Sequence, residues 1–244
     1  MGYGRGQDHN GGRDDKGDKI ACPGEREDNG MASARRIGAP DAKNRGVLLD
    51  AAEQLMLDDG YAAVTSRRVA DKAGLKPQLV HYYFRTMDDL FLAIFRRRAE
   101  QGLAAQQLAL QSDQPLWNLW RFNTDPVGTR LTMEIMGLAN HRKALRTEIA
   151  YYAERFREQE TKAFTAALEQ NGFAQEDVPP VVWAVFATSI SRVLVMEQEI
   201  GMSCGHQETL AMVDSWLRRL EGEPLPMPDF EAMLAALGEV DEQS

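Results

Sequence analysis

The stretch that decides the fold is Val64–Phe84, which reads VTSRRVADKAGLKPQLVHYYF. It predicts two short helices joined at Gly74, because only glycine takes the left-handed backbone of such a turn without strain. Thr65 is a good N-cap for the first helix, and Pro77 fits the first turn of the second, where its missing N–H costs nothing. The apolar residues expected to hold the two helices together are Val69, Ala70, Ala73, Leu75, Val80 and Phe84. The pattern is that of a helix-turn-helix.

The second helix of this unit has a polar outward face. Gln78, His81 and Tyr82 stand at positions i, i+3 and i+4, so they share one side of the helix. A core role for His81 and Tyr82 is the alternative, but in so short a unit the residues after Val80 cannot all face inward. The outward face fits the major groove of DNA, where Gln78 can pair with adenine through two hydrogen bonds and Leu79 can touch a thymine methyl.

With its surroundings, this block resembles the N-terminal domain of the TetR family of transcriptional regulators. The resemblance begins near Arg45 in an amphipathic helix, passes through Asp59-Gly60-Tyr61 and the helix-turn-helix, and ends near Asp88-Asp89-Leu90. The match keeps order and spacing over this whole stretch, so a chance match is improbable. A weaker similarity is Gly205-His206-Gln207-Glu208, which is similar to a loop before the last helix of many members.

Three residues depart from the family pattern. Met87 stands where many members carry a phosphate-binding lysine, and Arg68 stands where many have an acidic residue that closes a capping box. Lys76 replaces the usual serine before the proline, and by its reach it can restore the phosphate charge that Met87 lacks.

The resemblance implies a homodimer that binds a palindromic operator in double-stranded DNA. By resemblance, Ser66, Lys76 and Tyr82 would contact phosphates. The predicted DNA-binding residues are Arg45, Thr65, Ser66, Arg67, Lys76, Pro77, Gln78, Leu79, His81 and Tyr82.

The charge distribution supports a nucleic-acid partner although the net charge of the chain is −9. Residues 41–100 hold ten Lys/Arg against nine Asp/Glu, or +1, whereas residues 101–244 hold eleven against twenty-one, or −10. Residues 1–40 balance at seven against seven. Because the local potential decides phosphate binding, the acidic C-terminal half does not argue against DNA binding.

Other classes of protein are disfavoured by the motifs that the sequence lacks. Cys22 and Cys204 are far apart and fit a reducing cytoplasm, and no apolar run is expected to cross a membrane. No HExxH, P-loop, GxSxG or paired-cysteine motif occurs, so we expect no enzyme, no cofactor and no catalytic residue. His206 with Cys204 and Glu208 lacks a fourth ligand, so a loop role is favoured over a metal site.

The chain is predicted to be all-α, with an N-terminal three-helix DNA-binding domain and a C-terminal helical domain for ligand binding and dimerisation. Residues 1–40 are expected to form a disordered arm, 41–101 the DNA-binding domain with the helix-turn-helix at about 65–84, 102–222 the C-terminal domain, and 223–244 a tail with a short helix at 230–237. Asp41 is expected to cap the first helix, and Arg96-Arg97-Arg98 to be a solvated helix end.

The last two long helices, expected at 179–200 and 206–220, are the candidate dimer interface. The first is apolar nearly all round, so it should be buried on every side. A monomer core is the alternative, but a pair reading a palindrome is the more economical design, and the resemblance implies a four-helix bundle across the two-fold axis. The predicted interface residues are Phe186, Ile190, Leu194, Val213, Trp216, Leu217 and Leu220.

Aromatic residues and methionines of the C-terminal half are the candidates for an apolar inducer pocket. They suit a pliable cavity, although ordinary helical core is the alternative for each of them. The set comprises Trp117, Trp120, Met133, Met136, Tyr152, Phe156, Trp183 and Phe186, with Arg121, Arg130, His141 and Ser189 as candidate polar handles.

These features favour a DNA-binding repressor that a mainly apolar small molecule releases from its operator. The alternative is a DNA-bound scaffold that answers to a protein partner, which an acidic C-terminal half without a ligand would fit.

Overall fold

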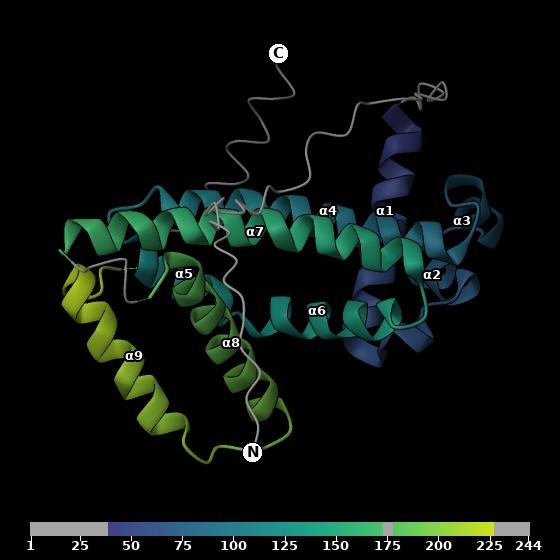
Figure 1. Ribbon diagram of the computed structural model, residues 1–244. Helices are drawn as coiled ribbons and strands as arrows, with labels where there is room; N and C mark the ends of the chain where they lie inside the picture. Colours follow the sequence, from purple (N-terminus) through teal and green to yellow (C-terminus); the bar gives the residue numbers. More distant parts are fainter. Residues whose placement is uncertain (1–38, 173–177, 227–244) are drawn as a thin grey trace, which may run out of the picture. The chain divides into compact units, whose positions relative to one another are not determined.

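The computed structural model describes residues 39–172 and 178–226, and every regular element in these ranges is helical (Figure 1). The expected all-α class is confirmed. The elements are α1 Ala39–Asp59, the 3-10 turn η1 Tyr61–Ala63, α2 Ser66–Ala73, α3 Pro77–Tyr83, α4 Met87–Leu110, α5 Pro115–Asn123, α6 Pro126–Ala139, α7 Lys143–Gln170, α8 Pro180–Glu199 and α9 His206–Glu221. Most of the predicted arm and the predicted helix at 230–237 lie outside the described residues.

The ends of the short helices follow from their local sequence. Thr65 Oγ1 accepts a hydrogen bond from the N–H of Arg68 at 3.3 Å and caps α2, and Gly74 ends that helix at φ 66°. Pro77 opens α3 as predicted. The expected cap of α1 was wrong, because that helix begins at Ala39, two residues before Asp41.

Helix α4 begins with a reciprocal cap. Thr86 Oγ1 accepts from the N–H of Asp89 at 3.1 Å, and the Asp89 carboxylate accepts from the N–H of Thr86 at 2.9 Å. Two of the amides that a helix start leaves without a partner are thereby satisfied. The direction in which α4 leaves the helix-turn-helix is therefore set by local sequence.

The helix-turn-helix rests on one apolar core that also includes parts of α6 and α7. Val69 and Ala70 of α2 and Val80 of α3 are fully buried against α1 and α4. The α6 and α7 residues of the same core are Leu131, Ile135, Leu138, Ala139 and Leu145. The proposed domain boundary at residue 101 lies inside α4, so the N-terminal helix-turn-helix domain and the C-terminal helical domain share a continuous helix and this core.

The arginine run Arg96-Arg97-Arg98 does not form a solvated helix end. It lies in the middle of α4, and ion pairs tie it to α1 and α7. Arg97 contacts Asp50 at 2.6 Å and Glu53 at 3.0 Å, and Arg98 also contacts Glu53. Arg96 contacts Glu148 of α7 at 2.5 Å. Glu53 on α1 is only 7% exposed, so its carboxylate requires paired cations. The arginines that supply them hold α4 against α1.

A second core joins α5, α7, α8 and α9 at the other end of α7. Leu116, Trp117 and Leu119 of α5 are buried there with Phe164, Ala167, Ala184 and Leu217. Glu221, the last residue of α9, accepts hydrogen bonds from the N–H groups of Leu116 and Trp117 at 2.8 and 3.0 Å. It caps the start of α5 from a distance in sequence, and burial raises the pKa of its carboxyl group.

Helix α8 is buried on one side only. Ala184, Thr188, Ser191 and Val195 face the core, while much of the remaining apolar surface is exposed. A single chain therefore does not supply the burial on every side that the sequence of α8 predicts. By length and composition alone α8 is also apolar enough to cross a bilayer, contrary to expectation, although core helices of soluble proteins meet the same criterion.

Candidate nucleic-acid interface and dimer face

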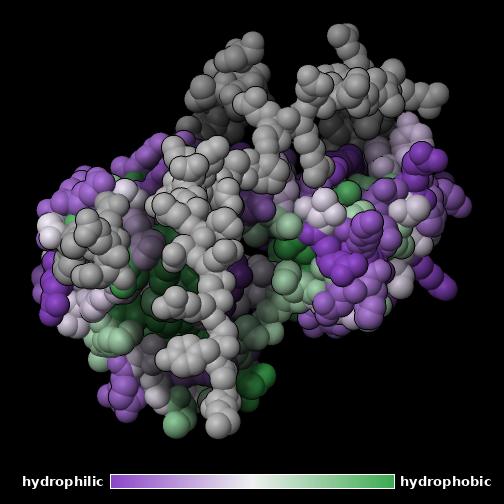
Figure 2. Space-filling view, viewed as in Figure 1, coloured by the Kyte–Doolittle hydropathy of each residue, from purple (hydrophilic) through white to green (hydrophobic). Residues whose placement is uncertain are grey.

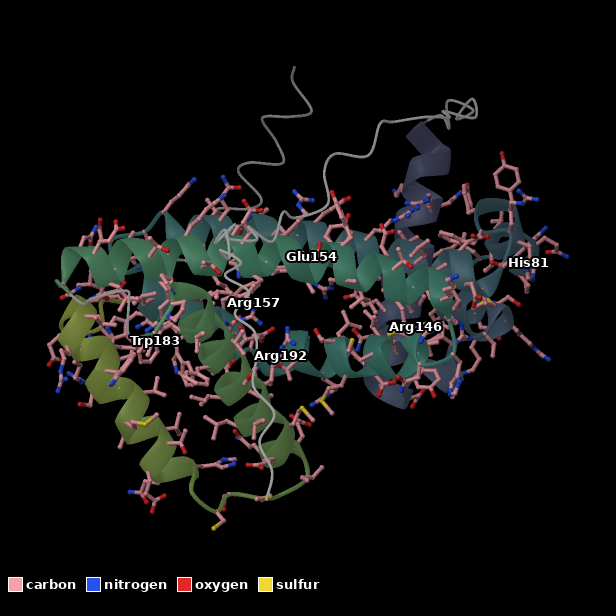
Figure 3. All side chains as sticks on the ribbon, in the orientation of Figure 1. His81, Arg146, Glu154, Arg157, Trp183 and Arg192 are labelled. Carbon is pink, nitrogen blue, oxygen red and sulfur yellow. The ribbon has the colours of Figure 1, made fainter. Side chains whose placement is uncertain are left out.

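The outward face of α3 carries the side chains predicted to read DNA. Gln78, His81 and Tyr82 are all exposed, and Tyr82 has 63% of its surface accessible. His81 lies on the outer side of α3 in Figure 3. The Tyr82 ring packs edge-on against Tyr83, with centroids 5.0 Å apart, which holds its hydroxyl away from the core. Tyr83 is half-buried and Phe84 is buried, as expected for core residues.

Cations without a partner surround this face. Arg67, Lys76 and Arg85 are exposed and form no ion pair with any described residue. Their neighbours Arg68 and Lys72 instead pair with Asp59 at 2.6 Å and Asp58 at 3.1 Å. Unpaired cations are available to neutralise phosphates.

The caps of α2 and α3 lie beside these cations. Thr65 and Ser66 begin α2, and Lys76 and Pro77 begin α3. Helix starts present free N–H groups that suit phosphate oxygens. The structure therefore brings eight of the ten predicted DNA-binding residues to α2 and α3 in suitable surroundings.

Two predicted DNA-binding residues are placed less favourably. The guanidinium of Arg45 lies over the Phe84 ring, 5.4 Å from its centroid, and is half-buried. Leu79 is half-buried against the helix-turn-helix core, which limits its reach toward a thymine methyl. Met87 also packs against this core, so it cannot replace the phosphate-binding lysine.

The second candidate surface is an apolar face formed by α8 and α9. Apolar surface gathers in Figure 2 over the region where Figure 1 places these two helices. Of the predicted interface residues, Phe186 is 51% exposed and Trp216 is 36% exposed. Leu194 and Leu217 are buried in the subunit itself, which corrects their assignment to the interface. Ile190, Val213 and Leu220 are half-buried.

The sequence prediction missed most of this exposed face, although the residues are adjacent to those named. We define the α8–α9 face as the large apolar side chains of these helices that stay exposed: Val181, Val185, Phe186, Val193, Met196, Ile200, Leu210, Met212 and Trp216. The sequence did contain a signal for this face, because α8 is apolar on all sides. A helix that faces solvent carries apolar residues along one side only, so the outer side of α8 is not typical of a solvent-exposed surface.

The eight residues predicted to line a ligand pocket do not come together. The second core, which joins α5, α7, α8 and α9, contains Trp117, Trp120 and Trp183. A separate cluster with α4 contains Tyr152 and Phe156. Met133 and Met136 lie exposed on α6, and Phe186 lies exposed on α8. The prediction of one shared pocket was therefore wrong, because these residues belong to helices that face different neighbours. A hollow of about 730 Å³ lies between α4, α7 and α9, and none of these eight residues lines it.

The four candidate polar handles are also separated. Arg121 donates to the side chain of Asn118 and to the carbonyl of Leu225, and Arg130 pairs with Glu199 at 3.0 Å. His141 and Ser189 are exposed. These positions do not form one polar site.

The polar centre of the C-terminal domain is Glu160 of α7, which sequence reasoning missed. It is 3% exposed, and four helices supply groups around it. Its oxygens accept from Gln106, Asn123 and Thr188 at 3.3, 3.4 and 3.0 Å, and Arg157 lies 3.4 Å away. The sequence offered one signal for this buried site. Glu160 stands four residues from both Phe156 and Phe164, so helical spacing places its carboxylate on the apolar side of α7.

Burial has opposite effects on the charged groups of this cluster. It raises the pKa of the Glu160 carboxyl group despite the nearby Arg157, and withdrawal from water lowers the pKa of Arg192. Arg157 and Arg192 come from the adjacent helices α7 and α8 (Figure 3). The hydrogen bonds of the cluster link four helices, so they fix the positions of these helices along one another.

His206 has a structural partner. Its Nε2 lies 2.8 Å from a carboxylate oxygen of Glu197, which ties the start of α9 to the end of α8. Cys204 is exposed. The geometry fits the predicted loop role of this segment.

Taken as geometry, an exposed helix face flanked by unpaired cations in a helix-turn-helix defines a DNA-binding protein. Comparison with known proteins agrees. Residues 48–94 match the sequence profile of the bacterial regulatory proteins of the tetR family. The chain is 28% identical over 97 residues to the transcriptional activator FasR of Mycolicibacterium smegmatis, covering 40% of this chain and 41% of FasR. It is 29% identical over 122 residues to the regulator BetI of Rhizobium meliloti, covering 46% of this chain and 60% of BetI.

Solved structures extend the similarity of the fold to the C-terminal helices. A TetR-family protein from Rhodococcus sp. superposes with a TM-score of 0.60 at 17% identity, over 72% of this chain and 99% of its own. A TetR regulator from Haloarcula marismortui gives a TM-score of 0.59 at 18% identity, over 72% and 96%. Residues 48–94 are thus similar to the bacterial regulatory proteins of the tetR family, and the solved structures show that the chain shares their fold.

Proposed function

We propose that the protein is a homodimeric, cytoplasmic regulator that binds a palindromic operator through α3 and releases it when a small molecule binds the C-terminal domain. The observation that carries the proposal is the exposed face of Gln78, His81 and Tyr82, with Arg67, Lys76 and Arg85 unpaired beside it. In this arrangement the cations and helix starts hold the phosphate backbone, and the side chains of α3 contact the bases.

Dimerisation supplies the second part of the proposal. One α3 helix covers only half of a two-fold site, and the α8–α9 face leaves nine large apolar side chains exposed. Two copies related by a two-fold axis would bury this face and present two α3 helices to successive major grooves. Two linked half-sites then bind far more tightly than one.

Ligand control is the third part. The polar centre at Glu160 lies among α4, α5, α7 and α8, and α4 runs from there to the helix-turn-helix. A ligand that displaces these helices would tilt α4 and change the separation of the two α3 helices, so that both half-sites could no longer be occupied together. Repression is the proposed sign of regulation.

The test is footprinting of the purified protein on genomic DNA of the organism that encodes it, followed by release assays with a panel of metabolites. The expected result is a protected two-fold symmetric segment near a promoter, and loss of protection with one class of small molecule. Uniform, sequence-independent protection would contradict operator binding. Protection that no metabolite removes, together with a captured protein partner, would replace ligand control by partner control.

A further inference from the structure

One contact joins α6 to the turn that precedes the helix-turn-helix. The Glu134 Oε2 atom of α6 accepts a hydrogen bond from the backbone N–H of Tyr61 at 2.7 Å, across 73 positions of sequence. The preceding residue, Gly60, has φ 79°, and the Glu134 carboxylate lies 3.4 Å from the place that a Cβ atom would take there. The turn is thus shaped to receive this carboxylate.

A second α6 residue, one turn further on, completes the contact. A Cβ atom on Gly137 would lie 3.4 Å from Cε1 of the Tyr61 ring, which is an ordinary contact distance, so the ring packs directly on this part of α6. We call Glu134 and Gly137 together the α6 socket, because they hold the backbone and the ring of the same tyrosine.

The α6 socket is anchored on both sides. On the side of the helix-turn-helix, Leu131, Ile135 and Leu138 are buried in the core that holds α2 and α3. On the side of the α8–α9 face, Arg130 pairs with Glu199 at the end of α8 at 3.0 Å. Since Arg130 and Glu134 are four residues apart on one helix, α6 links the end of α8 directly to the turn before α2.

This linkage determines how firmly the recognition helices are held relative to the dimer axis. The α1–α2 turn already has its own hydrogen bonds, from Ala63 N–H to Gly60 and from Val64 N–H to Tyr61. What its own bonds do not fix is its position relative to the C-terminal domain, which depends on α4 and on α6. Because both α4 and α6 attach the helix-turn-helix to the C-terminal domain, it cannot pivot about either helix alone.

We propose that Glu134 and Gly137 are positioning residues for DNA recognition, which set the separation of the two α3 helices by fixing the helix-turn-helix to α6. The inference rests on the proposed operator binding by a homodimer. It predicts that removal of the Glu134 carboxylate leaves each half-site contact and the buried core of Leu131, Ile135 and Leu138 intact. The turn before α2 is then held less firmly on α6, so the two helix-turn-helix units move over a wider range. The protein should then tolerate operators whose half-sites are wrongly spaced.

The test uses the full chain and an operator obtained by selection, together with versions that have one or two base pairs added or removed at the centre. Each base pair changes the separation of the half-sites by about 3.4 Å. Wild-type protein should lose about tenfold or more in affinity on each altered spacing, and Glu134→Ala should lose only about threefold. Glu134→Gln should behave as wild type, because its amide oxygen can accept the same N–H. Thr132→Ala is the matched control, because Thr132 is exposed on the same helix and its hydroxyl bonds only to Gly128.

A second readout does not involve DNA. Amide hydrogen exchange at residues 60–64 should accelerate in Glu134→Ala and stay unchanged in Glu134→Gln and Thr132→Ala. If Glu134→Ala shows the wild-type spacing profile and wild-type exchange, the inference is wrong. Should that variant fail to fold, Glu134→Asp gives the same test, because its carboxylate is one methylene short of Tyr61. Wild-type protein that binds no duplex would instead overturn the proposed function, whereas the exchange result would still report on the socket.

Discussion

The indole rings of Trp183 in α8 and Trp216 in α9 lie with their centroids 4.0 Å apart, and they join the two helices of the proposed dimer face. Phe186 packs edge-on against Trp183 at 6.2 Å and remains 51% exposed. Aromatic side chains held rigidly with one open face are frequent anchors of protein interfaces. The relationship makes the α8–α9 face a preformed surface rather than a loosely packed one.

A charge on this face should separate the subunits. Val193 is 48% exposed in α8, and Val193→Asp would bury an unpaired carboxylate at the contact between two copies. We expect the dissociation constant of the dimer to rise by about 100-fold or more. Sedimentation at several protein concentrations measures this. The matched control is Val127→Asp on α6, because Val127 is 51% exposed and lies outside the face. Equal dimerisation of both variants would place the interface elsewhere.

Removing one phosphate contact should weaken binding to every DNA sequence. For Lys76→Ala we expect the slope of log affinity against log salt to fall by about one. Fluorescence anisotropy with an operator and an unrelated duplex, each at several salt concentrations, checks this. Lys162→Ala is the control, since that lysine is on α7 and pairs with Glu158 at 2.8 Å. An unchanged slope in Lys76→Ala would remove this residue from the interface.

A change at the base-reading face should have a different signature. Gln78→Ala should leave the salt slope unchanged but reduce discrimination at one base pair of each half-site, by about 1–3 kcal/mol. Competition binding with operators that carry each base in turn at that position measures the effect. A uniform loss over all positions would show that Gln78 contacts the backbone instead.

Loss of the carboxylate between α1 and α4 should destabilise the helix-turn-helix domain. Glu53 is 7% exposed and pairs with both Arg97 and Arg98, so Glu53→Ala leaves two guanidinium groups without their buried partner. Both guanidinium groups are partly exposed and Arg97 keeps Asp50, so we expect a loss of about 1–3 kcal/mol in the free energy of unfolding. Urea denaturation measures it, with Glu158→Ala on the exposed side of α7 as a control that should change little. If the free energy of unfolding falls no further in Glu53→Ala than in the control, the ion pairs of Glu53 with Arg97 and Arg98 are exposed to water in solution.

The buried Glu160 should make stability depend on pH. Burial raises the pKa of its carboxyl group above the ordinary 4.5 in the folded state, so the folded chain holds this proton more tightly than the unfolded chain does. The corresponding stability is fully present below about pH 4.5 and is lost as the pH rises through the raised pKa. Relative to Glu160→Gln, wild-type protein should therefore become less stable as the pH rises above 4.5 toward neutrality.

Thermal unfolding of both proteins across this range gives the comparison. The difference between them isolates Glu160 from the other titrating groups. A difference that stays constant with pH, or one that changes in the wild type's favour as the pH rises, would contradict the assigned burial.

The features that sequence could predict are those that neighbouring residues determine. The helix ends at Thr65, Gly74 and Pro77 depend on contacts within a few positions, so local patterns located them. The exposed face of α3 followed from the same logic, because helical spacing alone separates Gln78 from the core.

Features that depend on which helix faces which could not be predicted in this way. The Glu134–Tyr61 contact joins residues 73 positions apart, and no local pattern marks either as a partner. The run at Arg96 looked solvated because its acidic partners lie on α1 and α7. The predicted pocket failed for the same reason, since periodicity places Trp117 and Met136 on apolar faces without showing that those faces meet different neighbours.

The central claim is that paired subunits place α3 in successive major grooves of a specific duplex. Selection of the full chain against a random pool of duplexes at low ionic strength tests it most directly. We predict enrichment of an inverted repeat whose half-sites are related by about one or two helical turns, and much weaker enrichment by Gln78→Ala. A pool that remains random after repeated rounds, with no duplex retarded by the wild-type protein, would contradict the claim.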